Sequence, residues 1–136
     1  RGHKHFSVFR MTEALSQKEL IPALEILDQQ LQSAPRENVR LFALIIMQFR
    51  RLLIIHSMFE QFYKESEIIG KISLPPFLSK QVLAQARNFT SEELQNIYTE
   101  LSKLDLRVKF KNTLAPLLIQ DLFQRICSGH FKNAVK

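Results

Sequence analysis

The sequence predicts an all-α fold, a helical bundle of about six or seven helices around one long central helix. Apolar residues recur every three to four positions through most of the chain, which is the spacing of amphipathic helices. No segment shows the apolar–polar alternation typical of a strand. The 136 residues include only three Gly, too few for the many tight hairpins of a β fold.

The central helix is expected over residues 39–63, which contain no Pro and no Gly. One side of it carries a broad apolar stripe formed by Leu41, Phe42, Ile45, Ile46, Phe49, Leu52, Leu53 and Tyr63. The other side carries a second apolar set formed by Leu44, Met47, Ile54, Ile55, Met58 and Phe62. A helix that is apolar over most of its circumference is usually central, or shared between a core and a partner.

Two helices are expected before the central one. The first covers residues 6–15, with Phe6 and Phe9 facing inward. Ser16 and Glu19 have the spacing of a capping box, which predicts that a second helix begins there. This helix is expected to end at residues 33–35.

Three further segments are expected to be helical after the central helix and before the last one. Residues 65–72 predict a short helical turn. Pro76 can open the next helix, because its missing N–H has no helical partner at that position. Thr90 and Glu93 form a second capping box ahead of a strongly periodic helix that runs to Val108.

The last helix is expected over residues 114–127, and its apolar residues cover an arc of roughly 220°. Such an arc is wider than one core face needs. We therefore predict that Ile119 and Phe123 lie near a surface covered by a partner, with Leu118 and Leu122 in the domain's own core. The next candidate for a partner surface is the second apolar patch of the central helix, around Leu44, Ile55 and Phe62.

The length predicts one domain, over residues 6–129. Residues 1–5 are expected to be a flexible tail or a cloning remnant, and residues 130–136 a basic C-terminal tail.

The net charge is +6, with a pI near 9.7. Charges spread over solvated helix faces are the favoured explanation of this balance, and contact with nucleic acid or an acidic partner is the alternative. Arg50 and Arg51 interrupt the longest apolar run, so no membrane span is predicted.

The sequence carries no recognisable site chemistry. Three Gly cannot supply a Gly-rich phosphate loop, and no zinc, zincin or EF-hand spacing occurs. We therefore predict no catalytic residue, no cofactor and no metal site. Cys127 is expected to be a small buried hydrophobe. His56 and Glu60 are one helical turn apart, and a packed, hydrogen-bonded histidine is favoured over a pH-sensitive pair.

Arg50 and Arg51 diverge by about 100° on the central helix. One is expected to face water and the other to bond a carboxylate or a helix C-terminus.

Residues 66–88 offer an alternative function, a basic helix-turn-helix-like DNA-binding module. Its second helix would present Lys80, Gln81, Gln85, Arg87 and Asn88.

The order of motifs resembles the C-terminal collar domain of the delta subunit of bacterial DNA polymerase III, a clamp-loader subunit. The motifs are Phe9, residues 13–15 (EAL), 23–27 (ALEIL), 48–53 (QFRRLL), 76–77 (PF), 85–94 (QARNFTSEEL), 104–105 (LD) and Lys109. Each motif alone is modestly specific, and their order and spacing carry the resemblance. The sequence departs from the family pattern at residues 110–113.

The resemblance implies an assembly role without catalysis. In that family the collar domain packs against equivalent domains of the other loader subunits, and the loader places the sliding clamp on DNA. The sliding clamp is contacted by N-terminal AAA-like domains, which this sequence lacks. The resemblance also implies a bacterial, cytoplasmic protein. Any DNA contact is expected to be weak and indifferent to sequence, because a modest positive charge neutralises phosphates without reading bases.

Overall fold

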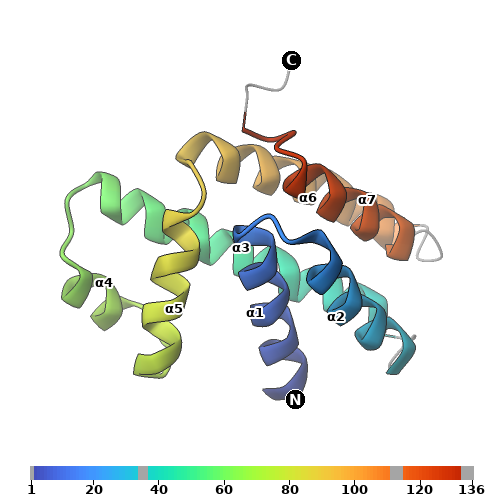
Figure 1. The fold of residues 1–136 in the computed structure, drawn as a ribbon, viewed down its shortest axis with the longest axis horizontal. Coiled ribbons are helices and arrows are strands. Elements are labelled where there is room, and N and C mark those ends of the chain that lie inside the picture. The colour runs from blue at the N-terminus through green and yellow to red at the C-terminus, as the bar shows by residue number, and fades with distance from the viewer. Residues whose placement is uncertain (1, 34–36, 111–114, 133–136) are drawn as a thin grey trace.

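The computed structural model describes residues 2–33, 37–110 and 115–132. Within these ranges it contains seven α-helices and no strand, which confirms the predicted all-α class (Figure 1). The helices are α1 (Gly2–Ser16), α2 (Leu20–Ser33), α3 (Asn38–Glu60), α4 (Glu65–Lys71), α5 (Pro76–Arg87), α6 (Ser91–Phe110) and α7 (Ala115–Cys127). Residues 34, 35 and 114, where a helix end and a helix start were expected, lie outside the described residues.

The helix α3 is central, as predicted. It contacts α1, α5, α6 and α7, and its most extensive contacts are with α6. Its predicted inward stripe is confirmed at Leu41, Phe42, Ile45, Phe49 and Leu52, all of which are buried. In Figure 1 the longest axis has α4 at one end, and α2 and α7 lie towards the other.

The same α3 is the one helix in the described residues that is long and apolar enough to cross a membrane. A core helix of a soluble protein has this length and composition too. Four helices of this domain pack on α3 and bury part of its apolar surface in the core, while Met47 and Ile54 on the same helix stay exposed.

The predicted capping box at Ser16 and Glu19 is wrong. Ser16 belongs to the last turn of α1, where its hydroxyl donates to the carbonyl of Glu13 at 2.8 Å. The chain then turns through Lys18, whose φ of 61° lies in the left-handed region. The backbone N–H of Glu19 donates to the carbonyl of Ala14, which closes the C-terminus of α1. The serine therefore ends a helix where the motif predicted the start of one.

The second predicted capping box is confirmed. The backbone N–H of Glu93 donates to Thr90 Oγ1 at 3.0 Å, and the backbone N–H of Thr90 donates to Glu93 Oε1 at 3.3 Å. Two N–H groups at the start of α6 are satisfied in this way. Pro76 opens α5 as expected.

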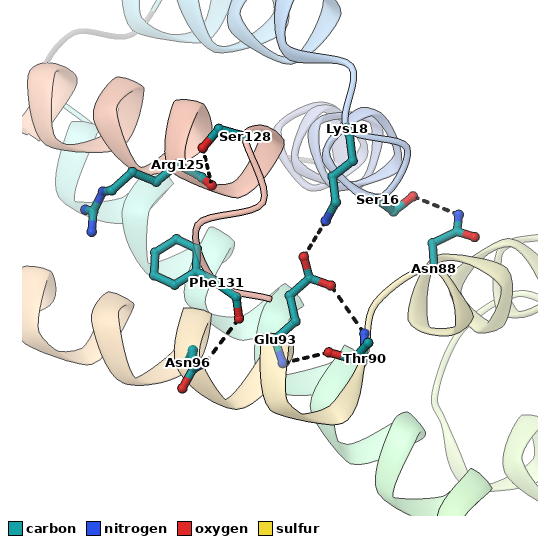
Figure 2. Close-up of polar contacts among 9 residues, drawn as sticks. All are labelled: Ser16, Lys18, Asn88, Thr90, Glu93, Asn96, Arg125, Ser128 and Phe131. Atoms are coloured by element: carbon teal, nitrogen blue, oxygen red, sulfur yellow. Dashed lines mark hydrogen bonds and ion pairs between the residues drawn. The ribbon is translucent and has the colours of Figure 1, made fainter. Parts of the chain in front are cut away.

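The folded part extends beyond the expected boundaries at both ends. The helix α1 begins at Gly2, so residues 2–5 continue the helix that was expected to start at residue 6. Near the other end, Phe131 is only 2% exposed, and its carbonyl accepts a 3.1 Å hydrogen bond from Asn96 Nδ2 on α6 (Figure 2). The expected tail at residues 130–136 therefore contains a residue of the core, because the turn after α7 returns over α6.

Candidate functional site

The described residues hold no group of three or more His, Cys, Asp or Glu side chains that would bind a metal ion. The features that stand out are a polar junction between helices and several grooves on the described surface. The junction joins α1, α3, α5 and the start of α6.

At the centre of this junction lies Gln85 of α5, which is fully buried. Its Nε2 donates to Glu13 Oε1 at 3.0 Å, and its Oε1 accepts from Thr12 Oγ1 at 3.0 Å and from Gln48 Nε2 at 3.4 Å. The buried amide thus ties α5 to α1 and α3. Buried polar groups that are fully paired specify one arrangement of the helices around them.

A second part of the junction is the ion pair between Lys18 and Glu93 (Figure 2). Lys18 Nζ lies 2.5 Å from Glu93 Oε2, and the Glu93 side chain is 1% exposed. The same ammonium lies 4.6 Å from the centre of the Phe89 ring. A left-handed φ costs a non-Gly residue roughly 1 kcal/mol. The ion pair and the ring contact offset this cost at Lys18.

Replacing Lys18 by Met should lower the free energy of unfolding by about 2–4 kcal/mol, because it leaves the buried Glu93 carboxylate without its cation. The measurement is urea unfolding followed by circular dichroism. Lys80→Met, at an exposed lysine of α5, is the control and should change stability by less than about 0.5 kcal/mol. Equal effects of the two substitutions would show that the ion pair contributes nothing to stability.

The predicted partner-facing residues are mostly core. Ile119, Phe123 and Ile55 are 0% exposed and Leu44 is 9% exposed. The wide apolar arc of α7 is instead covered by α1, α2, α3 and α6 of the same domain. Leu122 is buried as predicted, while Leu118 is half-buried. The prediction of a partner surface is therefore wrong for the fully buried Ile119, Phe123 and Ile55, whereas Leu44 is buried but lines the α1–α3 groove.

Phe62 is the exception among these residues. It follows the C-terminus of α3, is 92% exposed and has a φ of 63°. The backbone N–H of Tyr63 donates to the carbonyl of Met58, so the left-handed residue closes the helix. Glycine is the usual residue at such a position.

The helix-turn-helix alternative receives little support from α5. Gln85 is buried in the junction, and Arg87 pairs with Glu65 at 2.5 Å and lies over the Phe59 ring. The side-chain amide of Asn88 donates to Ser16 Oγ at 3.4 Å. Three of the five side chains expected to contact bases are therefore engaged within the domain.

The paired arginines of α3 behave differently. Arg50 is exposed, as expected for one of the two. Arg51 is half-buried, and its Nη1 donates to Gln48 Oε1 at 2.7 Å, an amide where a carboxylate or helix end was expected. Burial lowers the pKa of Arg51.

His56 and Cys127 show no sign of a reactive site. His56 Nδ1 lies 4.0 Å from Glu60 Oε2 and has no hydrogen-bond partner, and the ring packs edge-to-face on Phe59. The hydrogen-bonded ring that was expected is thus not seen at Nδ1. Cys127 is half-buried, and burial raises the pKa of its thiol.

Several grooves lie on the described surface, and three of them are named by the helices that line them. The α3–α4 groove has a volume of about 400 Å³ and is lined by Met47, Arg50, Arg51, Ile54, Met58, Lys71, Ile72 and Ser73. The α1–α3 groove, of about 320 Å³, is lined by His5, Phe6, Val8, Phe9, Leu44, Met47, Gln48, Arg51, Leu74 and Leu78. The α2–α7 groove, of about 580 Å³, is lined by Ile21, Leu24, Glu25, Asp28, Leu117, Gln120, Asp121 and Gln124. The first two grooves share Met47 and Arg51 in their linings.

The described residues thus define a helical domain whose main surface features are apolar grooves. The model of the family "DNA polymerase III delta subunit, C-terminal domain" matches residues 5–126. The chain belongs to this family, which confirms the resemblance inferred from the motifs.

Two relatives from Bacillus subtilis agree with this assignment. The DNA polymerase III subunit delta of strain 168 is 27% identical over 127 residues, which cover 93% of this chain and 36% of the relative. The solved structure of the DNA clamp loader delta protein (YqeN) matches with a TM-score of 0.78 and 26% identity, covering 92% of this chain and 37% of that protein. The chain therefore spans little more than a third of the length of either relative.

The junction explains the most specific motif of the resemblance, residues 85–94. Gln85 is the centre of the buried network, and Phe89 packs edge-to-face on Phe49 with ring centres 5.9 Å apart. Thr90 and Glu93 cap α6, and Glu93 also binds Lys18. The motif is thus a set of residues that hold four helices together.

Proposed function

We propose that this domain holds a clamp-loader delta subunit in the assembled loader, by packing against the equivalent helical domains of neighbouring subunits. The observation that carries the proposal is the match to a clamp loader delta protein over 92% of this chain with a TM-score of 0.78. The exposed apolar grooves supply surface for such packing.

The proposal gives the domain an indirect role in replication, in the bacterial cytoplasm. The assembled loader would place the sliding clamp on DNA. Contact with the clamp would come from other parts of the full-length subunit, because the chain matches only 36% of its relative's length. The domain itself would act as an assembly element without a reaction centre.

The test is reconstitution of the loader with the full-length delta subunit and with the same subunit lacking this domain. We expect the full-length subunit to co-elute with the other loader subunits in size-exclusion chromatography and the truncated one to elute alone. Circular dichroism of the truncated subunit controls for loss of folding. Normal assembly of a folded truncated subunit would contradict the proposal, and ATP turnover by the isolated domain would contradict its non-catalytic role.

Phe62 is the residue for which stability and assembly should separate. Phe62→Asn should leave the free energy of unfolding unchanged or raise it by up to about 1 kcal/mol, because Asn tolerates a left-handed φ better than Phe does. We expect the same substitution to weaken assembly, since a 92% exposed phenylalanine is apolar surface that a partner can bury.

The measurements for Phe62→Asn are thermal melting and co-elution with the other loader subunits. Phe77→Asn is the matched control, because Phe77 is also an exposed phenylalanine, at 64%. If Phe62→Asn co-elutes with the other subunits as the wild type does, Phe62 is not part of a partner surface.

A further inference from the structure

The α3–α4 groove has an apolar floor made from one seam of α3. Met47, Arg51, Ile54 and Met58 follow one another at steps of four, three and four residues, so they lie on one side of the helix. The seam is about 16 Å long, or about three helical turns. Met47 is 53% and Ile54 47% exposed, although both lie on the helix at the centre of the core. A seam of this length suits a second helix laid along α3.

The rim of this groove is positively charged. Arg50, Arg51 and Lys71 line it, and no Asp or Glu does. The α2–α7 groove has the opposite character, since Glu25, Asp28 and Asp121 line it and no cation does. The two grooves lie towards opposite ends of the molecule, because α4 and the α2–α7 pair do (Figure 1).

Of the three cations that line the groove, Arg51 is the one whose charge is half-buried without a carboxylate partner in the described part of the chain. It is half-buried, and within the described residues its only hydrogen bond is to the neutral amide of Gln48. A guanidinium carries five N–H donors in a planar fork that matches a carboxylate. The cost of partly burying this charge is therefore offset, within the described part of the domain, by a single hydrogen bond to an amide.

We propose that the α3–α4 groove binds an amphipathic, acidic helix of a neighbouring loader subunit, with a carboxylate of that helix on Arg51. This proposal rests on the proposed function and deepens it by naming the surface and the chemistry of the partner. The apolar face of the incoming helix covers Met47, Ile54 and Met58. Methionine suits such a floor, because its flexible side chain adapts to the shape of a partner.

Nucleic acid fits the groove less well than a helix does. Single strands are usually bound by cations together with aromatic side chains on which bases stack. The lining of this groove contains no aromatic residue. The opposite sign of the α2–α7 groove also fits a ring-like assembly, in which each subunit uses different faces for its two neighbours.

The first test is a charge reversal at the rim. The full-length subunit carrying Arg50→Glu and Lys71→Glu is mixed with the purified loader subunits, and the affinity is measured by fluorescence anisotropy. We expect binding at least tenfold weaker than that of the wild type. Both side chains are exposed, so melting should be unchanged. The control is Lys80→Glu with Lys103→Glu, which changes the charge equally at exposed lysines outside the groove and should bind like the wild type.

The second test identifies the occupant. A photo-crosslinking amino acid replaces Ile54 in the full-length subunit, and the reconstituted loader is irradiated in the presence of primed DNA. We expect mass spectrometry to find the crosslink on a helical peptide of another loader subunit that carries Asp or Glu. A crosslinker in place of Leu106, an exposed leucine of α6 outside the groove, is the control for non-specific labelling.

The outcomes separate this proposal from the proposed function. If the wild-type subunit assembles only when the domain is present, but the rim variant assembles equally well and position 54 gives no protein crosslink, the groove proposal is wrong and the assembly function stands. A crosslink from position 54 to DNA would overturn it in favour of nucleic acid. If the truncated subunit assembles normally, the proposed function and this inference both fail.

Discussion

Replacing Phe123 by Ala should lower the free energy of unfolding by about 3–5 kcal/mol. The side chain is 0% exposed and lies on α7, which is covered by four other helices of the domain. Truncation removes most of a buried ring and leaves a cavity that the surrounding helices can fill only in part. For a domain of this size the midpoint of thermal unfolding should fall by roughly 10–20 °C.

The matched control is Leu117→Ala on the same helix, because Leu117 is 63% exposed. It should change stability by less than about 0.5 kcal/mol. Differential scanning calorimetry of both variants provides the measurement. If Phe123→Ala melts like the wild type, Phe123 is not a core residue, and the arrangement of α7 described above is incorrect.

Replacing Gln85 by Ala should destabilise the domain by about 2–4 kcal/mol, through two effects. It removes the partner of Thr12, Gln48 and Glu13, and a buried polar group without a partner costs about 1–3 kcal/mol. It also leaves a cavity between α1, α3 and α5. Guanidinium unfolding followed by circular dichroism measures the sum.

Gln85→Met separates the two effects, because methionine fills most of the volume but cannot form the hydrogen bonds. We expect Gln85→Met to be destabilised by about 1–2 kcal/mol, less than Gln85→Ala. Gln81→Ala, at an exposed position one turn earlier in α5, is the control and should be close to neutral. A Gln85→Met variant as stable as the wild type would show that the network is not important for stability.

The elements of the fold could be predicted because helical periodicity is a local property. The residues on the inward stripe of α3, the Thr90–Glu93 cap and the start of α5 at Pro76 all follow from contacts within a few positions. The failure at Ser16 also has a local cause. Ser16 and Glu19 satisfy the spacing of a capping box, but nothing in the spacing tells whether the preceding helix has already ended.

The surface residues could not be predicted in the same way. The width of an apolar arc shows how much of a helix is covered, but it does not show what covers it. For Phe123 the cover is the domain itself. On α3 the second apolar set was recognised, yet the structure buries Leu44 and Ile55 and exposes Met47 and Ile54. These residues are all apolar, and the packing of neighbouring helices determines which of them are buried and which are exposed.

The buried junction illustrates a further limit. Gln85 was considered as a residue that reads DNA bases, because glutamine is usually exposed on an amphipathic helix. Its burial depends on Thr12, Gln48 and Glu13, which are 73, 37 and 72 positions away. A single sequence does not show pairings over such distances. The pattern of the family motif was the only signal that residue 85 is special.

The helices α3 and α4 should open locally at different rates, because they are packed against different numbers of neighbouring helices. The helix α3 is held by four other helices, whereas α4 has its main contacts with α5. Local opening is governed by the number of buried contacts that must break. Amide protons of α3 should therefore exchange only when the whole domain unfolds, while those of α4 exchange through small, frequent openings. One wall of the α3–α4 groove is thus rigid and the other compliant, so the groove can adjust its width to an incoming helix without disturbing the core.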